Sequence, residues 1–253
     1  MDNHTHILTI DIGGSGIKAT VLDQHAHMIV PRKRLDTPEK STPDKVLETI
    51  IELVADFPDY SSISVGFPGY VKNGVIVTAP NLGSKQWKGV PLAAWIANAL
   101  NKPVRLVNDA DLLGLGVIDG EGLELMITLG TGLGTAFYID GHLLPHLELA
   151  HHPLKDGKDY DQYIGKAQLK KKGKKVWNKR MEHVLDIMQT VFNYDMLFIG
   201  GGSAKHLELD LEDNIRIVSN HDGIKGGVNL WRIEEDDLCV RTVYPESNMV
   251  ENK

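Results

Sequence analysis

Cysteine is almost absent from this sequence, because Cys239 is the only one among 253 residues. A lone thiol excludes an internal disulfide and any cysteine-rich zinc site. Long apolar runs are missing as well, since no stretch approaches the ~18 residues that a membrane-spanning helix needs. The first residues, MDNHTH, are polar and lack the apolar core of a secretory signal peptide. We therefore expect a cytoplasmic protein without a membrane partner.

An excess of positive charge is also missing, since the formal net charge is -7. A dedicated nucleic-acid partner is therefore not expected. Hydrophobic residues make up 42% of the chain and charged residues 24%, a balance typical of globular proteins. The length suits two modest domains or one large one.

What the sequence does contain is a glycine-rich turn between two strand-like runs, at 9–20 (TIDIGGSGIKAT). Glycines let a phosphate approach the backbone closely, and Asp11 at the end of the first run could hold hydrated Mg²⁺ beside it. An ordinary β-hairpin turn is the simpler alternative. A P-loop or a dinucleotide-binding turn fits poorly, because both open a helix and here a strand follows.

The same pattern returns at 125–140 (LMITLGTGLGTAFYID). A shift of 117 positions, from Ile10 to Ile127, also superposes three further identical pairs: Gly13 and Gly130, Ala19 and Ala136, and Asp23 and Asp140. The repeat suggests two related halves. Two such turns would offer many backbone N–H donors to a polyanion, which favours phosphate binding over a plain hairpin.

Apolar periodicity and turn residues outline the remaining elements. Helices are predicted over 44–57, 91–100 and 174–192, and a last one begins at 226–231. Strands are predicted within 31–43 and at 63–67, 104–107, 198–199 and 215–219, with an Asn73-Gly74 hairpin inside 71–79. A third glycine-rich turn, at 200–202, follows an apolar strand. Strands that alternate with helices indicate an α/β architecture.

Asp109 is the strongest candidate for chemistry. It lies after the predicted strand 104–107, at the sheet edge where ligands bind in open α/β folds. Opposite two phosphate turns, its natural task is to accept a proton from an attacking hydroxyl. The alternative, which spacing alone favours, is that Asn108 or Asp109 caps the following helix.

Two polar segments of the second half allow several interpretations. Glu148, His151 and His152 form a weak metal pattern, and they could instead bind a polyhydroxylated ligand or be solvated loop residues. Residues 165–180 carry only cationic charges, which indicates a solvated helix face or a track for a polyanion. Nucleic acid would require interleaved aromatics, and Trp177 fits the apolar stripe of its helix better.

Together these motifs resemble the ROK sugar kinases of the actin, Hsp70 and hexokinase superfamily, and within them the polyphosphate glucokinases. Nine segments carry the resemblance, in order along nearly the whole chain: DIGGSGIKA (11–19), GFPG (66–69), APNLGSKQWKGVPL (79–92), VNDAD (107–111), TLGTGLGTA (128–136), ELAHHP (148–153), GKKVWNKR (173–180), FIGGGSA (198–204) and GIKGGVNLW (223–231). The resemblance implies two ribonuclease H-like (actin-like ATPase) domains around a central cleft. We expect them at 1–112 and 113–253, with a last helix that can pack back on the first domain.

The implied reaction is phosphoryl transfer from inorganic polyphosphate, ATP or both to the 6-hydroxyl of glucose, with Mg²⁺ as cofactor. Asp109 would be the base, and Asp11 would hold Mg²⁺ through water. The implied glucose ligands are Gly69, Asn81, Asn108, Asp109, Glu148, His151 and Asp161. The implied phosphate or nucleotide ligands are Asp11, Gly13, Gly14, Ser15, Gly16, Lys18, Gly130, Thr131, Gly132, Gly134, Gly200, Gly201 and Gly202. In ATP-using members the last three lie beside the adenosine. The implied polyphosphate track is Lys166, Lys170, Lys171, Lys172, Lys174, Lys175, Lys179 and Arg180.

The sequence departs from the family pattern in two places. Most ROK kinases carry zinc-binding cysteines after the sugar-binding histidine, whereas 153–165 contains none, as in polyphosphate-using members; no zinc site is therefore expected. Asp161 is the positional match to a sugar-binding glutamate that follows those cysteines. Ala150 stands where a glycine is usual, and its methyl group could shift His151.

Two other functions remain open at this point. One is a strictly ATP-dependent hexokinase acting on glucose or mannose. The other is a non-enzymatic sugar or nucleotide sensor, but family repressors add an N-terminal helix-turn-helix, and Asp11 leaves no room for one. A homodimer is expected, because family members are commonly dimeric.

Overall fold

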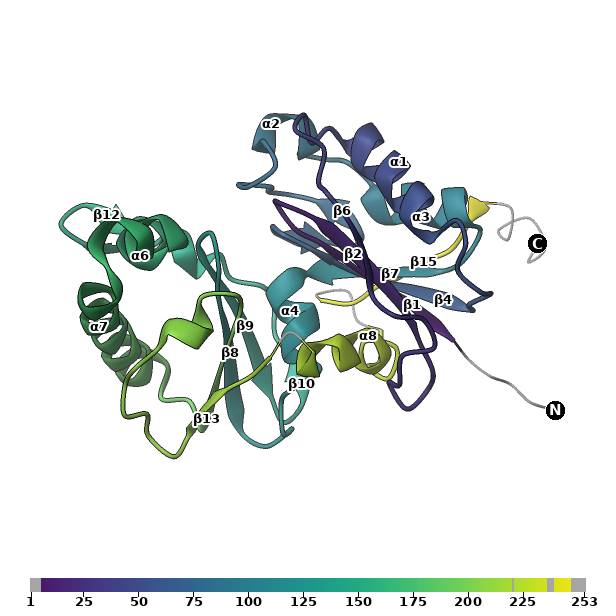
Figure 1. The fold of residues 1–253 in the computed structure, drawn as a ribbon. Coiled ribbons are helices and arrows are strands. Elements are labelled where there is room, and N and C mark those ends of the chain that lie inside the picture. The colour runs from purple at the N-terminus through teal and green to yellow at the C-terminus, as the bar shows by residue number, and fades with distance from the viewer. Residues whose placement is uncertain (1–5, 220, 236–238, 247–253) are drawn as a thin grey trace. The chain divides into compact units, whose positions relative to one another are not determined.

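The computed structural model describes residues 6–219, 221–235 and 239–246. Contacts divide the chain into two units, one formed by residues up to Gly116 together with those from Ile224 onward, and the other by Val117–Gly223. The division lies slightly beyond the expected boundary at 112, and the last segment belongs to the first unit. Each unit contains its own sheet (Figure 1). No helix among the described residues is long and apolar enough to cross a membrane.

The first unit is built on a six-stranded sheet in the order β15-β7-β4-β1-β2-β3. Its strands are β1 (Ile7–Ile12), β2 (Ile17–Leu22), β3 (Lys33–Leu35), β4 (Ser62–Phe67), β7 (Val104–Asn108) and β15 (Thr242–Val243). Its helices are α1 (Pro43–Val54), α2 (Ser84–Trp87), α3 (Leu92–Leu100), α4 (Asp109–Gly114) and α8 (Gly226–Asn229). Figure 1 shows α1 and α3 on one face of the sheet and α8 on the other. The main core accordingly joins Leu8 and Ile10 of β1 to α1 and α3, while Ile7 contacts Val228 of α8.

Residues 226–229 follow the second unit in the sequence but belong to the first, where they lie close to α4 and β4. The would-be Cβ of Gly226 would collide with the carbonyl oxygen of Leu112 in α4, so only glycine fits there. Asn229 donates its side-chain N–H to the carbonyl of Leu115 at 2.7 Å. Ser64 of β4 donates its hydroxyl to the carbonyl of Gly227 at 2.6 Å. Residues 226–229 therefore support the helix that begins at Asp109.

The second unit has a five-stranded sheet in the order β10-β9-β8-β13-β14. Its strands are β8 (Leu123–Leu129), β9 (Leu133–Ile139), β10 (His142–Leu143), β13 (Met196–Gly200) and β14 (Ile215–Ile217), and a separate hairpin is formed by β11 (Pro153–Lys155) and β12 (Lys158–Asp159). Its helices are α5 (Tyr160–Ile164), α6 (Lys166–Lys172) and α7 (Lys174–Phe192), with 3₁₀ turns at Leu149–His151 and Ala204–His206. A third 3₁₀ turn, Asp222–Lys225, spans the division between the units. Side chains of α7 pack on those of β8 and β13 in one core.

Several predicted elements are confirmed. Helix α7 begins and ends at the predicted residues, and the fully buried Trp177 donates its indole N–H to the carbonyl of Ile164 at 2.6 Å. The apolar periodicity also predicts Val191 on the buried stripe of α7, and this prediction is wrong, since Val191 is 61% exposed. The hairpin of β5 (Val71–Lys72) and β6 (Val75–Ile76) turns at Asn73 and Gly74, both with positive φ, as an Asn-Gly turn requires.

The predicted repeat is present, but its alignment needs one correction. In both units a hairpin, β1–β2 or β8–β9, is joined to a parallel strand, β4 or β13. The first hairpin closes around the turn 13–16, whereas the second closes around the shorter turn 130–132. A shift of 117 therefore holds for β1 and β8 but is wrong by one residue for β2 and β9. The correction overturns two predicted matches: Ala136 with Ala19, and Asp140 with Asp23.

Candidate active site

Strand register places a row of side chains at the carboxyl end of β1. Asp11 pairs with Lys18 of β2 on one side and with Gly66 of β4 on the other. Lys18 Nζ donates to Asp11 Oδ2 at 2.7 Å, and the Asp11 side chain is 45% exposed. Gly66 leaves room for α4, because a Cβ there would lie 3.3 Å from the Cα of Asp109. Gly66 is thus the strand neighbour of Asp11 and also lies against the backbone of Asp109.

The start of α4 shows which residue caps the helix, a question that the sequence leaves open between Asn108 and Asp109. Asn108 is the N-cap: its Oδ1 accepts the N–H of Ala110 at 2.7 Å and that of Asp111 at 3.4 Å. Its Nδ2 donates to the carbonyl of Gly69 at 3.1 Å, which fixes the amide. Asp109 is half-buried and also accepts the N–H of Ala110, at 2.9 Å. Because Asn108 caps the helix, the Asp109 carboxylate is not needed for that purpose.

The first glycine-rich turn is held by groups that the sequence did not point to. The carbonyl of Gly13 accepts the Thr37 hydroxyl at 2.6 Å, and the carbonyl of Ser15 accepts Arg34 Nη2 at 2.7 Å. Within the turn the N–H of Gly13 donates to the carbonyl of Gly16 at 3.1 Å. Asn81, an implied glucose ligand, lies beside this turn, since a Cβ on Gly14 would be 3.7 Å from the Asn81 Cβ. With the carbonyls of Gly13, Ser15 and Gly16 engaged, the turn is suited to presenting N–H groups to an anion.

The second and third glycine-rich turns meet at the end of β8. The N–H of Gly130 donates to the carbonyl of Gly132 at 3.0 Å. Gly201, at a φ of 87°, lies against Leu129, where a Cβ would collide with the backbone. The N–H of Ser203 donates to the carbonyl of Leu129 at 2.9 Å. The second unit thus places two glycine turns together without any charged side chain in them.

The implied sugar ligands of the second unit form a cluster. Glu148 Oε2 lies 3.9 Å from His151 Nε2, and Glu148 Oε1 lies 3.9 Å from the nearly buried His146 Nε2. Asp161 Oδ1 accepts the N–H of Leu133, directly after the second turn, at 2.7 Å. Carboxylates and imidazoles accept and donate hydrogen bonds in the pattern that sugar hydroxyls need. His146 was not predicted, because nothing in its spacing separates it from other loop histidines.

Electrostatics tie Asp161 to this cluster. Burial raises the pKa of Asp161 above its ordinary value, and the negative charges of Asp159 and Glu148 add to the effect. The N–H of Leu133 and the positive charge of His151 act in the opposite direction. Among the described residues, no group of three or more His, Cys, Asp or Glu side chains could hold a metal ion. The metal alternative for Glu148, His151 and His152 therefore finds no support.

The cationic segment divides into two groups of side chains. Lys174 donates to the carboxylate of Glu208, while Arg180 donates to the carbonyl of Tyr163 at 2.7 Å and covers its ring at 4.7 Å. These two cations hold neighbouring elements together. The other six are exposed: Lys166, Lys170, Lys171, Lys172, Lys175 and Lys179.

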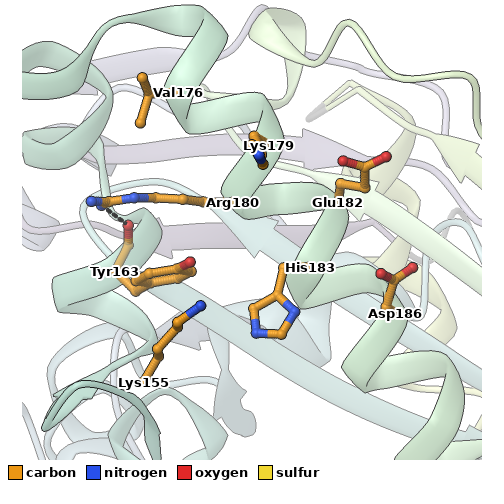
Figure 2. A pocket seen from close by; sticks show the side chains of 8 residues that line it. All are labelled: Lys155, Tyr163, Val176, Lys179, Arg180, Glu182, His183 and Asp186. Atoms are coloured by element: carbon orange, nitrogen blue, oxygen red, sulfur yellow. Dashed lines mark hydrogen bonds between the residues drawn. The ribbon is translucent and has the colours of Figure 1, made fainter.

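A pocket of about 330 Å³ lies beside α7. Figure 2 shows Arg180 stretched over the Tyr163 ring, with Lys155 and His183 close to the same ring. Glu182 and Asp186, also on α7, bring negative charge to the lining, so the pocket has mixed charge. It contains none of the implied sugar ligands.

Comparison with known proteins decides the family. Residues 7–150 match the sequence profile of the ROK family. The chain belongs to the ROK family. It is 34% identical over 207 residues to the polyphosphate glucokinase of Mycobacterium leprae, and the match covers 78% of this chain and 63% of that protein. It is 32% identical over 210 residues to the polyphosphate glucokinase of Mycobacterium tuberculosis, covering 79% of this chain and 78% of that protein.

Solved structures of ROK proteins have the same fold. The inorganic polyphosphate/ATP-glucomannokinase from Arthrobacter sp. strain KM has a TM-score of 0.76 and 31% identity, covering 88% of this chain and 97% of that one. A ROK family glucokinase from Streptomyces griseus, in complex with glucose and AMPPNP, has a TM-score of 0.74, covering 89% and 98%, and at 18% identity it supports the fold alone. The predicted ROK resemblance and the actin-like ATPase fold class are confirmed. The roles of individual site residues stay predictions.

Proposed function

We propose that this ROK protein is a glucokinase that transfers a phosphoryl group from inorganic polyphosphate, ATP or both to the 6-hydroxyl of glucose. The observation that carries the proposal is the place of Asp109, whose Cα lies against Gly66, the register partner of Asp11 at the end of the first sheet, while Asn108 caps the helix. The polyphosphate glucokinases and the glucomannokinase that the chain resembles support the same reaction.

In the proposed reaction, Asp109 orients the 6-hydroxyl and accepts its proton. The hydroxyl oxygen bonds to the terminal phosphorus while the bond from that phosphorus to the bridging oxygen breaks. The bridging oxygen leaves with its electron pair on the shortened polyphosphate or on ADP, and the proton passes from Asp109 to solvent. Most of the acceleration in such transfers comes from positioning and electrostatic stabilisation, so one carboxylate is sufficient as base.

Magnesium fits the residues of the first unit. Mg²⁺ is usually held by one or two carboxylates together with substrate phosphates and water, and Asp11 is a half-exposed carboxylate beside a phosphate turn. When bound, the metal would neutralise charge on the phosphates and orient them. Lys18, which pairs with Asp11, would then donate to the donor phosphates.

Glucose would be recognised by the residues that the family resemblance implies. In the second unit Glu148, His151 and Asp161 would bind its hydroxyls, and in the first unit Asn81 and Asn108 would do so, together with the backbone of Gly69. Carboxylate and amide groups built to pair with hydroxyls discriminate strongly against sugars that lack them.

Polyphosphate would bind the exposed lysines of α6 and α7. Helix α7 begins after Gly173, which offers no side-chain cap, and its first turn contains Lys174 and Lys175 but no acid. Cations at a helix N-terminus are unfavourable by themselves, because that end already carries a partial positive charge. A bound polyanion would reverse this penalty. Inorganic polyphosphate has no base or ribose, so such a track would be its main means of recognition.

One assay tests the proposal. Glucose 6-phosphate formation is coupled to NADPH production and followed in parallel with polyphosphate and with ATP, with and without Mg²⁺. We expect product with polyphosphate, and product from ATP alone would favour the strictly ATP-dependent hexokinase. No product with either donor, from protein whose folding is verified by circular dichroism, would overturn the proposed function. Light scattering on the same sample tests the expected homodimer.

A second experiment tests the lysine track. Neutralising five lysines (Lys170, Lys171, Lys172, Lys174 and Lys175) should raise KM for polyphosphate far more than KM for ATP. Equal changes for both donors would contradict a track that is specific for polyphosphate.

A further inference from the structure

Arg34 continues the row of side chains that begins beside Asp109. In the sheet register Asp11 of β1 pairs with Lys18 of β2, and Lys18 pairs with Arg34 of β3. Directly paired residues of adjacent strands project to the same face, about 4.8 Å apart per strand. The face therefore presents one acid followed by two cations, next to the first glycine-rich turn.

The Arg34 guanidinium lies directly on that turn. Its Nη2 donates to the carbonyl of Ser15 at 2.7 Å, and a Cβ on Gly16 would collide with its Nε. Gly16 thus provides the space that the guanidinium fills. The Arg34 side chain is 48% exposed, so its outer edge faces solvent at the place where a phosphate would approach the turn.

The counterion of Arg34 is easily exchanged. Arg34 Nη1 lies 2.7 Å from Asp36 Oδ1, but the Asp36 side chain is 83% exposed. Ion pairs this exposed contribute little, whereas a guanidinium and a phosphate can form two parallel charge-assisted hydrogen bonds. A phosphate could therefore replace Asp36 at small cost.

We propose that Arg34 binds the phosphoryl donor, as the second cation of a row that runs from Asp109 past Asp11 and Lys18. The proposal rests on the proposed function, since it assumes that the turn 13–16 binds phosphates. Its ligand is a chain of at least three linked phosphates, as found in inorganic polyphosphate and in ATP. Arg34 is a binding residue here, and it takes no part in proton transfer.

The test compares Arg34→Gln with Arg34→Lys and with the control Arg32→Gln, which removes an exposed arginine just before β3. Loss of charge-assisted hydrogen bonds should raise donor KM about tenfold or more in Arg34→Gln, with KM for glucose unchanged within about twofold. Arg34→Lys should be intermediate, because lysine keeps the charge but lacks the planar fork. Arg32→Gln should behave like the wild type.

A binding measurement distinguishes phosphate binding by Arg34 from a purely structural hydrogen bond between Arg34 and the turn. Tripolyphosphate without metal should raise the Tm of the wild type and of Arg32→Gln, and it should raise that of Arg34→Gln much less. An Arg34→Gln protein that keeps wild-type donor KM and the full tripolyphosphate shift would overturn the Arg34 proposal, although the wild type would still be a kinase. A rise in KM for glucose as large as that for the donor would overturn it too. Absence of activity in the wild type would instead contradict the proposed function.

Discussion

The two units share one sheet topology but differ in where they carry charge. The order β7-β4-β1-β2-β3 in the first corresponds to β14-β13-β8-β9-β10 in the second. Two of the matching register positions differ, Asp11 against Thr128 and Lys18 against Gly134, while the third is glycine in both units, Gly66 and Gly200. The first sheet edge thus has an ion pair where the second has a hydroxyl and a glycine. Two units with the same strand order can therefore differ at the sheet edge: one presents charged side chains there, and the other presents mainly backbone groups.

The second unit carries its charged groups elsewhere. Glu148, His151 and Asp161 belong to the segment between β10 and α6, where a hairpin and a short helix are inserted. The corresponding connection in the first unit, from β3 to α1, is a short loop. The proposed sugar-binding groups of the second unit therefore lie on an insertion, whereas the proposed base and phosphate-binding groups of the first unit lie at the carboxyl edge of its sheet. The comparison can be tested by changing matched residues in the two units.

The largest effect is expected from Asp109→Asn in the first unit. Removing a general base should lower kcat by about 10³-fold, while KM for glucose changes little. The Tm should stay close to that of the wild type, because Asn108 still caps α4. The coupled assay and a thermal melt measure both quantities. Asp44→Asn, which removes an exposed acid from the first turn of α1, is the matched control. Near wild-type turnover in Asp109→Asn would exclude Asp109 as the base.

The next effect compares the register-matched residues Asp11 and Thr128. Asp11→Asn should lower kcat/KM by about 10²-fold and raise the Mg²⁺ concentration needed for half-maximal rate, because it removes a charged ligand from the donor site. Thr128→Val should change kcat/KM by no more than about fivefold, since a single hydroxyl contributes on the order of 1 kcal/mol. Equal losses of kcat/KM in the two variants would contradict the distinction between a charged edge in the first sheet and a neutral edge in the second.

A moderate effect is expected in stability. Each unit has one fully buried tryptophan whose indole N–H donates to a carbonyl: Trp87 to Ser41 at 2.8 Å, and Trp177 to Ile164 at 2.6 Å. Phenylalanine at either site removes this hydrogen bond, which should cost about 1–3 kcal/mol. The cost should be smaller at Trp87, because the Ser41 carbonyl still accepts Gln86 Nε2 at 3.3 Å. Chemical denaturation followed by circular dichroism should show that the two substitutions affect different transitions. A single shared transition, shifted equally by both, would mean that the units unfold together.

The smallest effect concerns Asp161 and pH. Its folded-state pKa is raised above the ordinary 3.8, mainly by burial, so its contribution to stability is complete below 3.8 and is lost as pH rises through the raised value. Glu148 and Asp159 add to this loss, and His151 opposes it. Asp161→Asn keeps the acceptor for Leu133 without the charge, so its Tm should exceed that of the wild type near neutral pH. Melts repeated below 3.8 should show the difference vanishing, and a constant difference would contradict the titration of Asp161.

Local patterns in the sequence predicted much of this fold. The limits of α7, the Asn-Gly hairpin and the burial of Trp177 depend on neighbouring residues, and all are confirmed. The alignment of the repeat failed in β9, because one deleted turn residue shifts every following side chain by one position. The sequence also predicts that the tail at 246–253 frays, but residues 247–253 lie outside the described residues, as do 1–5, 220 and 236–238.

The candidate site was predictable only in part. Asp11, Asp109 and the three turns stand out because strand ends and glycines are visible in sequence. Arg34 does not stand out, because its place beside Lys18 depends on the register of a three-residue strand. Which residue caps α4 depends on which side chain reaches the N–H groups at the start of the helix. Spacing alone cannot distinguish Asn108 from Asp109.

The supports of α4 have a consequence for biosynthesis. Residues 226–229 pack on α4 and β4, yet they are translated after the whole of the second unit. During translation the first sheet therefore lacks these contacts until residues 226–229 are synthesised. The hydrogen bond from Ser64 to Gly227, for example, joins residues more than a hundred positions apart. We expect nascent chains that end before residue 226 to lack a firmly held Asp109. Phosphoryl transfer would then begin only after residues 226–229 have been synthesised, which is later than the whole of the second unit.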